Sequence, residues 1–119
     1  METYLVNGVE LTYDTFDLEQ IERWEQESKR VNAEFDRIRQ QESGAAAIRS
    51  ICYAMMDSFD ILCGEGTAHR VFGDRVNVKE IYEGYQSFFQ AVSRAIQEFS
   101  KQPTESMNRE SRRRAAYRA

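Results

Sequence analysis

The amino-acid sequence predicts a mainly α-helical fold: three long helices plus one short helical turn, preceded by a short N-terminal β-hairpin and followed by a flexible basic C-terminal tail. An Asn-Gly pair separates two β-favouring runs, apolar residues recur at helical spacing in three long segments, and glycines lie between those segments. At 119 residues the chain has the length of one domain. We expect a helical domain with its hairpin over residues 1–103 and a basic, disordered tail over residues 104–119.

The charge of the chain is divided unevenly. The formal net charge is −4, from 16 Lys and Arg against 20 Asp and Glu. Residues 104–119 hold five of those Arg and two of the Glu, so the tail carries +3 and residues 1–103 carry −7. An acidic body is poorly suited to bind a phosphate backbone. A basic tail on an acidic body is typical of an interaction segment.

The hairpin is predicted from Asn7-Gly8, because a two-residue type I′ turn needs positive φ at both of its central residues. Strands are expected over residues 3–6 and 9–13. A two-stranded hairpin is only marginally stable by itself. It must therefore pack on the helices or pair with another chain, and the second option would make it an oligomerisation edge.

The first helix is predicted to begin after Asp17, which caps it, with Gln20 three residues later. Its apolar residues form a narrow seam at alternating spacings of three and four, interrupted by Ser28: Ile21, Trp24, Val31, Phe35 and Ile38. The seam has two interpretations. It packs on its own domain, or it also meets a second subunit as a self-association surface.

The second helix is expected over residues 45–63, and Gly64 is a suitable residue to end it. A short helical turn follows, which Thr67 caps and Gly73 ends. The third long helix begins after Asn77, with Glu80 at the capping-box position. It carries many aromatic residues, and Pro103 is expected to stop it.

No set of residues in the sequence indicates catalysis, a cofactor or a metal site. The glycines of residues 64–66 lack the Gly-Lys-Ser/Thr ending of a phosphate-binding loop. His69 has no Cys or carboxylate at the spacing of metal ligands. Asp57 and Asp60 can share a helix face, but without a further catalytic partner they are interpreted as solvated or salt-bridged carboxylates. Ser50 and Ser58 have no accompanying base in a recognisable motif. We therefore expect a protein that is not an enzyme.

The cysteines Cys52 and Cys63 lie too far apart on one helix to form a disulfide, at roughly 16 Å for eleven residues. Free thiols in a reducing compartment are expected. The sequence has no signal-peptide pattern and no window of 18 apolar residues, so we expect a cytoplasmic protein without a membrane span.

The basic tail contains a cluster of arginines, which are Arg109, Arg112, Arg113 and Arg114. This cluster can dock on an acidic protein surface, contact the phosphates of a nucleic acid, or serve only to solubilise a disordered segment. Tyr117 is the only aromatic residue of the tail, so a platform for stacking bases is not indicated.

Several segments together resemble a known family. They are the hairpin Tyr-Leu-Val-Asn-Gly-Val-Glu-Leu, the helix start Phe-Asp-Leu-Glu, the connector Gly-Glu-Gly-Thr-Ala-His-Arg-Val-Phe-Gly, the aromatic helix and the ending Asn-Arg-Glu-Ser-Arg-Arg-Arg. In this order they look like small proteins encoded beside tail genes in phages and prophages of Gram-positive bacteria, which are similar to tail assembly chaperones. The likeness covers nearly the whole chain.

The resemblance implies a non-enzymatic, mostly helical protein that acts in the host cytoplasm and self-associates. Such chaperones bind the tape measure protein and recruit tail tube subunits, and a typical member also exists as a longer, frameshifted form. We expect phage tail proteins as partners, a homo-oligomer, no membrane and no nucleic acid. Two alternatives stay open. One is a small nucleic-acid-binding regulator that uses the tail, and the other is a structural head-tail or tail component of the virion.

Overall fold

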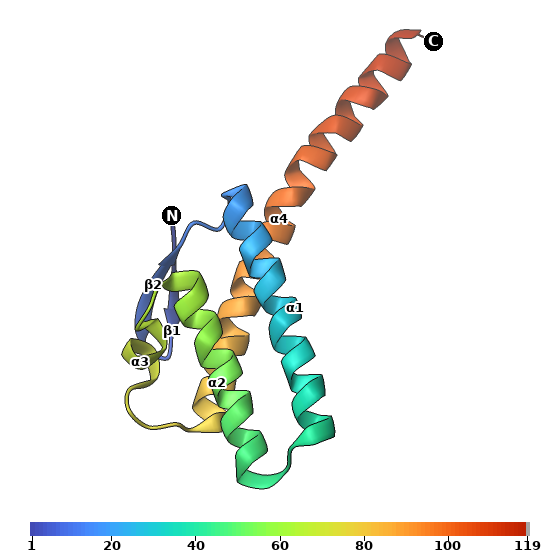
Figure 1. The fold of residues 1–119 in the computed structure, drawn as a ribbon. Helices are drawn as coiled ribbons and strands as arrows, with labels where there is room; N and C mark the ends of the chain where they lie inside the picture. The colour runs from blue at the N-terminus through green and yellow to red at the C-terminus, as the bar shows by residue number, and fades with distance from the viewer. Residues whose placement is uncertain (119) are drawn as a thin grey trace.

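The computed structural model describes the backbone of residues 1–118 and the side chains of residues 1–101. It confirms a mainly helical fold with an N-terminal hairpin (Figure 1). The elements in chain order are β1 Glu2–Val6, β2 Val9–Tyr13, α1 Leu18–Gln41, α2 Gly44–Cys63, α3 Thr67–Phe72 and α4 Val78–Arg118.

The hairpin packs on the helices, which is one of the two options that the sequence left open. Its antiparallel register runs from Glu2 opposite Tyr13 to Val6 opposite Val9. Asn7 and Gly8 both have positive φ, at 50° and 77°, as a type I′ turn requires. One face of the hairpin is buried through Val6, Leu11 and Tyr13, with β1 against α4 and β2 against α2.

The long helix α2 lies at the centre of the arrangement, in contact with α1, α3, α4 and β2 (Figure 1). Phe88 of α4 joins these layers because its ring meets aromatic rings from three other elements. Its ring centroid lies 5.5 Å from that of Tyr4, 5.9 Å from that of Tyr13 and 5.5 Å from that of Phe59. Phe88 and Phe89 are buried and form part of the core, whereas Tyr82 and Phe99 of the same helix are exposed.

Two of the three predicted helix caps are confirmed. The side chain of Asp17 accepts a hydrogen bond from the backbone N–H of Gln20, and Asn77 Oδ1 accepts one from the N–H of Glu80 at 3.1 Å. The predicted cap at Thr67 is wrong. Gly66 occupies that position with φ 87°, and the Thr67 hydroxyl instead donates back to the Gly64 carbonyl at 2.6 Å. A left-handed residue is needed just before α3, and glycine adopts that conformation without strain.

The connector from Gly64 to Gly73 is held in place by neighbouring elements. Asp60 Oδ1 accepts a hydrogen bond from the N–H of Ala68 at 2.9 Å, and so satisfies a free donor in the first turn of α3. Asn7 Nδ2 donates to the carbonyl of Val71 at 2.9 Å, and so ties the hairpin turn to α3. The connector therefore has an architectural role within the domain.

Helix α4 continues through Pro103 to Arg118, so the expected end of the helix at Pro103 is wrong for the backbone. Proline removes one donor, the N–H that would bond to the carbonyl four residues earlier. The residues after it include Ala and Arg, which are good helix formers, so the helix can resume. The last part of α4 extends away from the remainder of the chain (Figure 1), and the principal extents of the molecule are 68 × 33 × 22 Å.

Candidate functional site

The predicted self-association seam of α1 faces the interior of its own domain. Val31 and Ile38 are 0% and 1% exposed. Trp24 and Phe35 are half-buried and pack against the core, and Ile21 is also half-buried. A side chain that is already buried within one chain has no surface left for a second copy. The interpretation of Val31 and Ile38 as a contact between subunits is therefore corrected, because they belong to the core.

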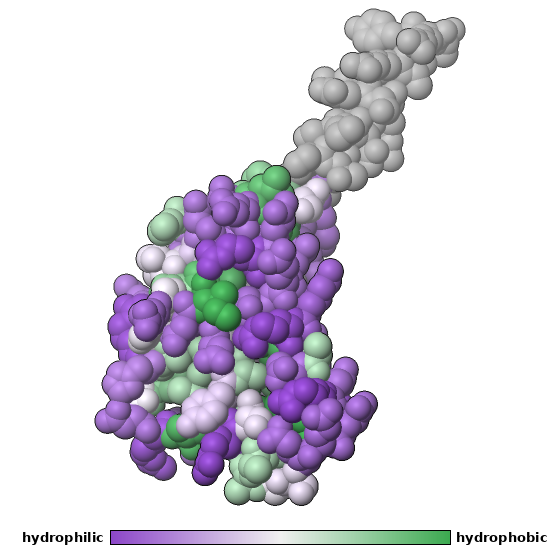
Figure 2. All heavy atoms as spheres, viewed as in Figure 1, coloured by the Kyte–Doolittle hydropathy of each residue, from purple (hydrophilic) through white to green (hydrophobic). Residues whose placement is uncertain are grey.

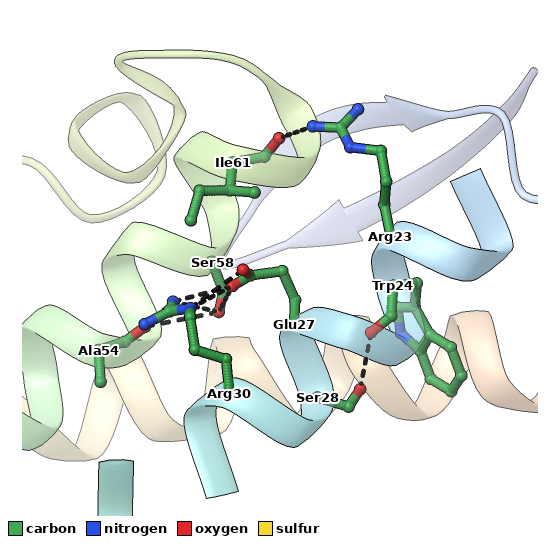
Figure 3. A network of polar contacts seen from close by, with 8 residues as sticks. All are labelled: Arg23, Trp24, Glu27, Ser28, Arg30, Ala54, Ser58 and Ile61. Carbon is green, nitrogen blue, oxygen red and sulfur yellow. Dashed lines mark hydrogen bonds and ion pairs between the residues drawn. The ribbon is translucent and has the colours of Figure 1, made fainter. Parts of the chain in front are cut away.

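A buried polar cluster joins α1 to α2 beside this seam (Figure 3). Glu27, only 7% exposed, lies against α2 and receives a forked pair of hydrogen bonds from Arg30, with Nε and Nη2 at 2.8–3.0 Å from its carboxylate oxygens. Ser58 Oγ donates to Glu27 Oε2 at 2.9 Å, and Arg30 Nη2 donates to the Ala54 carbonyl at 3.2 Å. All oxygens of this cluster have partners.

The electrostatics of the cluster indicate a structural role. The hydrogen bonds from Arg30 to Glu27 raise the pKa of Arg30 above its ordinary value, against the opposing effect of its partial burial. Partial desolvation of its carboxyl group also raises the pKa of the neighbouring Asp57, although this side chain is exposed. Ser58 is fully buried, so its hydroxyl is inaccessible to a substrate although a carboxylate lies beside it. The cluster fixes α1 on α2.

Glu27 is the residue that sequence reasoning missed. It lies three positions after Trp24 and four before Val31, which places it on the same side of α1 as the apolar seam. A charged residue at such a position is a usable signal, because buried charges need a partner. Another polar contact also joins α1 to α2: the Arg23 guanidinium donates a hydrogen bond to the carbonyl of Ile61 (Figure 3).

The other residues singled out from the sequence are not brought together. Asp60 is engaged with α3, whereas Asp57 is exposed. His69 is exposed and lies 3.4 Å from Asp74. Within residues 1–101, no group of three or more His, Cys, Asp or Glu side chains is arranged to hold a metal ion. In the described part of the chain, no helix has the length and apolar character needed to span a bilayer.

Both cysteines are free thiols, as the sequence predicted. Cys52 is fully buried. Cys63 is half-buried, and its burial raises the pKa of its thiol to about 11. A thiol with such a pKa is protonated at neutral pH and is a poor nucleophile. Neither cysteine therefore has the environment of a reactive thiol.

A surface groove lies where α2 approaches the segment between α3 and α4. It has a volume of about 480 Å³ and is lined by Ala45, Ile48, Arg49, Tyr53 and Val76. Three of these side chains are large, apolar or aromatic, and close to half exposed: Ile48 at 45%, Tyr53 at 49% and Val76 at 50%. Exposed apolar side chains that gather around one hollow are typical of a binding surface. We call this the Tyr53 groove.

A second apolar surface, the Phe99 patch, consists of Phe16, Leu18 and Phe99. The rings of Phe16 and Phe99 lie 5.0 Å apart, and the three side chains are 42%, 68% and 53% exposed. Apolar atoms are visible at this end of the molecule, beside the start of α1 and the point at which α4 leaves the body (Figure 2). The side chains of the predicted docking residues Arg109, Arg112, Arg113 and Arg114 lie outside the described part of the chain.

A family model described as a family of unknown function (DUF6673) matches residues 7–118. The match begins at the hairpin turn and runs to the end of α4, so it includes the Tyr53 groove, the Phe99 patch and the arginine cluster. No curated protein and no solved structure matches the chain.

Proposed function

The chain belongs to the family of unknown function DUF6673, and we propose that it is a non-enzymatic protein-binding protein of phage tail assembly, similar to tail assembly chaperones. It would act in the host cytoplasm, self-associate, and bind an aggregation-prone tail component such as the tape measure protein. The observation that carries protein binding is the Tyr53 groove. The phage setting rests on the resemblance carried by the connector at residues 64–73 and by the Asn-Arg-Glu-Ser-Arg-Arg-Arg ending.

The Tyr53 groove suits a short apolar segment of a partner chain. Ile48 and Tyr53 come from α2, and Val76 comes from the segment before α4, so an apolar side chain entering the groove would contact two separate elements. Tyrosine is common at protein interfaces because its ring is apolar and its hydroxyl can keep a polar partner. Arg49 beside the groove would favour a segment with an acidic flank.

The test is co-expression of this chain with the tape measure protein of the same phage or prophage. The expected result is a soluble complex that survives purification, with the tape measure protein insoluble when expressed alone. The variants Ile48→Asp and Tyr53→Asp should abolish the complex and leave the helical circular dichroism unchanged, since both side chains are close to half exposed. Leu5→Asp is the matched control, because Leu5 is 66% exposed on the outer side of β1.

Two results would overturn the proposal. One is a tape measure protein that stays insoluble in the presence of the wild-type chain. The other is a complex that tolerates the groove variants as well as it tolerates Leu5→Asp. Purified virions distinguish a chaperone from a structural tail component, since a chaperone should be absent from them. A salt-sensitive shift of duplex DNA that disappears on deletion of residues 104–119 would favour the nucleic-acid-binding regulator.

A further inference from the structure

We infer that the Phe99 patch and the acidic start of α1 form the docking surface for the basic end of α4 from a second copy of this chain. Each copy would offer both surfaces, so two copies would exchange their helix ends around a twofold axis. This inference rests on the self-association that the proposed function includes, and it names the surfaces through which self-association occurs. Val31 and Ile38 of the α1 seam are buried and cannot supply them.

The start of α1 is strongly acidic and its charges are exposed. Residues 14–25 contain five carboxylates and Arg23 alone as a cation, a net charge of −4. All five acidic side chains point to solvent: Asp14, Asp17, Glu19, Glu22 and Glu25. Asp17 and Glu19 lie at the start of α1, where the helix dipole stabilises negative charge. Glu22 and Glu25 lie beyond the first turn and gain little from the dipole. The neighbouring part of α4, with Arg94, Glu98 and Lys101, adds only one net positive charge.

The acidic residues adjoin the Phe99 patch rather than forming a separate cluster. Leu18, Glu22 and Glu25 are spaced by four and three residues and so lie along one exposed stripe of α1. Phe16 precedes the same helix, and its ring packs at a tilt against that of Phe99 at the point where α4 leaves the body. An apolar centre with acidic residues beside it is suited to a partner segment that is basic and carries some apolar residues.

The end of α4 has the complementary composition. Residues 109–118 contain five Arg and one Glu, a net charge of +4, together with Ala115, Ala116 and Tyr117. In its own chain this segment points away from the acidic surface, because α4 continues outward from the body (Figure 1). Arg109 lies ten residues beyond Phe99, or about 15 Å along a straight helix. The basic segment can therefore reach an acidic surface of this composition only on another molecule.

The helix is long enough for a reciprocal exchange. Residues 99–118 span about 28 Å as a helix. If two copies approach with these segments antiparallel, the arginines of each lie beside the other copy's Phe99 and the start of its α1. This approach covers both Phe99 patches. It also pairs residues 14–25 of each copy, with net charge −4, with residues 109–118 of the other copy, with net charge +4. Because both pairings form at once, a second copy is favoured over an unrelated basic partner.

Charge exchange tests the inference in the full-length chain. We expect sedimentation equilibrium to show a wild-type dimer that weakens about tenfold or more between 50 and 300 mM NaCl, as partly exposed ionic contacts should. The double variant Glu22→Lys with Glu25→Lys should be monomeric, and so should Arg112→Glu with Arg113→Glu. An equimolar mixture of the two variants should dimerise again. In the mixed dimer the start of α1 with added lysines meets the end of α4 with added glutamates, so opposite charges are paired again.

The matched control is the double variant Glu65→Lys with Glu83→Lys, which makes the same change in net charge at exposed residues elsewhere. It should dimerise like the wild type. A monomeric wild-type protein, a mixture that stays monomeric, or equal loss of the dimer in the control would each overturn the inference. Binding of the basic segment to nucleic acid, with no dimer present, would also overturn it.

The outcome is separable from that of the proposed function. Each monomeric variant keeps the Tyr53 groove intact, so its complex with the tape measure protein can be assayed directly. If that complex forms although the wild-type chain is monomeric, the docking inference and the proposed self-association fail, and the proposed binding of the tape measure protein stands. If the charge exchange behaves as expected and no complex forms, the reverse holds.

Discussion

The carboxylate of Glu27 accepts a 2.9 Å hydrogen bond from the hydroxyl of Ser58, across the contact between α1 and α2. Arg30 closes the same contact by reaching both the carboxylate and the Ala54 carbonyl. Apolar side chains can pack between two helices in more than one register. A buried carboxylate is satisfied only in the register that places its hydrogen-bond partners opposite it. The cluster therefore explains why the narrow seam of α1 packs in a defined position.

Removal of the Glu27 carboxylate should destabilise the domain. We expect Glu27→Ala to lower the free energy of unfolding by about 2 kcal/mol, because Ser58 and Arg30 lose a charged hydrogen-bond partner. Urea unfolding followed by circular dichroism measures the change. Glu34→Ala is the control on the same helix, since Glu34 pairs with Arg37 at the surface and should have no measurable effect. Equal effects of the two variants would contradict the assignment.

A methyl group at Gly84 should also be destabilising. A Cβ there would lie 2.8 Å from Phe72 Cε1 and 3.3 Å from Val6 Cγ1, so the Phe72 ring would have to shift and the Val6 side chain would have to give slightly. We expect Gly84→Ala to cost about 1–3 kcal/mol through overpacking, in spite of the higher helix propensity of alanine. Ser87→Ala at an exposed position of α4 should be neutral or slightly stabilising. A stabilised Gly84→Ala variant would show that the packing here is looser than described.

The thiol of Cys63 should react slowly in the folded protein. Burial raises its pKa from 9.0 to about 11, so at pH 8 the thiolate population is lower by about 100-fold than at the unperturbed pKa. The rate of reaction with a disulfide reagent, measured in Cys52→Ala with and without urea, compares the folded thiol with the unfolded one. Reaction of folded Cys63 at the unfolded rate would rule out the buried environment.

The same shift predicts a loss of stability in alkali. Below pH 9 the thiol is protonated in both states, and the folded state carries no penalty from it. Between pH 9 and 11 the unfolded thiol ionises first, so the unfolded state binds fewer protons and stability falls as the pH rises. Burial raises the pKa of Tyr13 and Tyr85 to about 12, which extends the fall. In Cys63→Ala the urea midpoint should decline less between pH 9 and 11 than in the wild type.

The body should fold without the end of α4. Among the described residues, the buried hydrophobic core lies between Val6 and Val92. A chain ending at residue 103 should therefore keep the thermal midpoint of the full chain within a few degrees, measured by circular dichroism. A large loss of cooperativity would show that residues 104–119 contribute to the domain, against the predicted boundary.

Local sequence signals predict the hairpin and the starts of α1 and α4 correctly because the interactions involved are local. Asn7-Gly8, Asp17 and Asn77 each satisfy backbone geometry within three residues of themselves. The predicted end of the helix at Pro103 is wrong, because proline disfavours a helix interior without excluding it. The backbone of α4 continues past this residue.

The candidate surfaces were harder to predict because they depend on distant residues. The seam of α1 was correctly recognised as apolar, but its spacing is the same whether the partner is α2 or another subunit. Ile48 and Tyr53 were assigned to a helix, and only the fold places Val76 beside them. Phe16 and Phe99 are similarly 83 positions apart in sequence and touch only after α1 and α4 have packed.

The hydrogen bond from Asn7 to Val71, which lie 64 positions apart in the sequence, and the packing of β1 on α4 join the hairpin to elements that are synthesised well after it. During translation β2 can pack on α2 once residues 44–63 emerge, but β1 has no helix to pack on until Phe88 and its neighbours of α4 are made. For about 80 further residues of translation, roughly 4–16 s, the side of β1 that packs on α4 stays open. A protein proposed to bind other chains during assembly therefore has a period in its own synthesis during which β1 is open to misassociation.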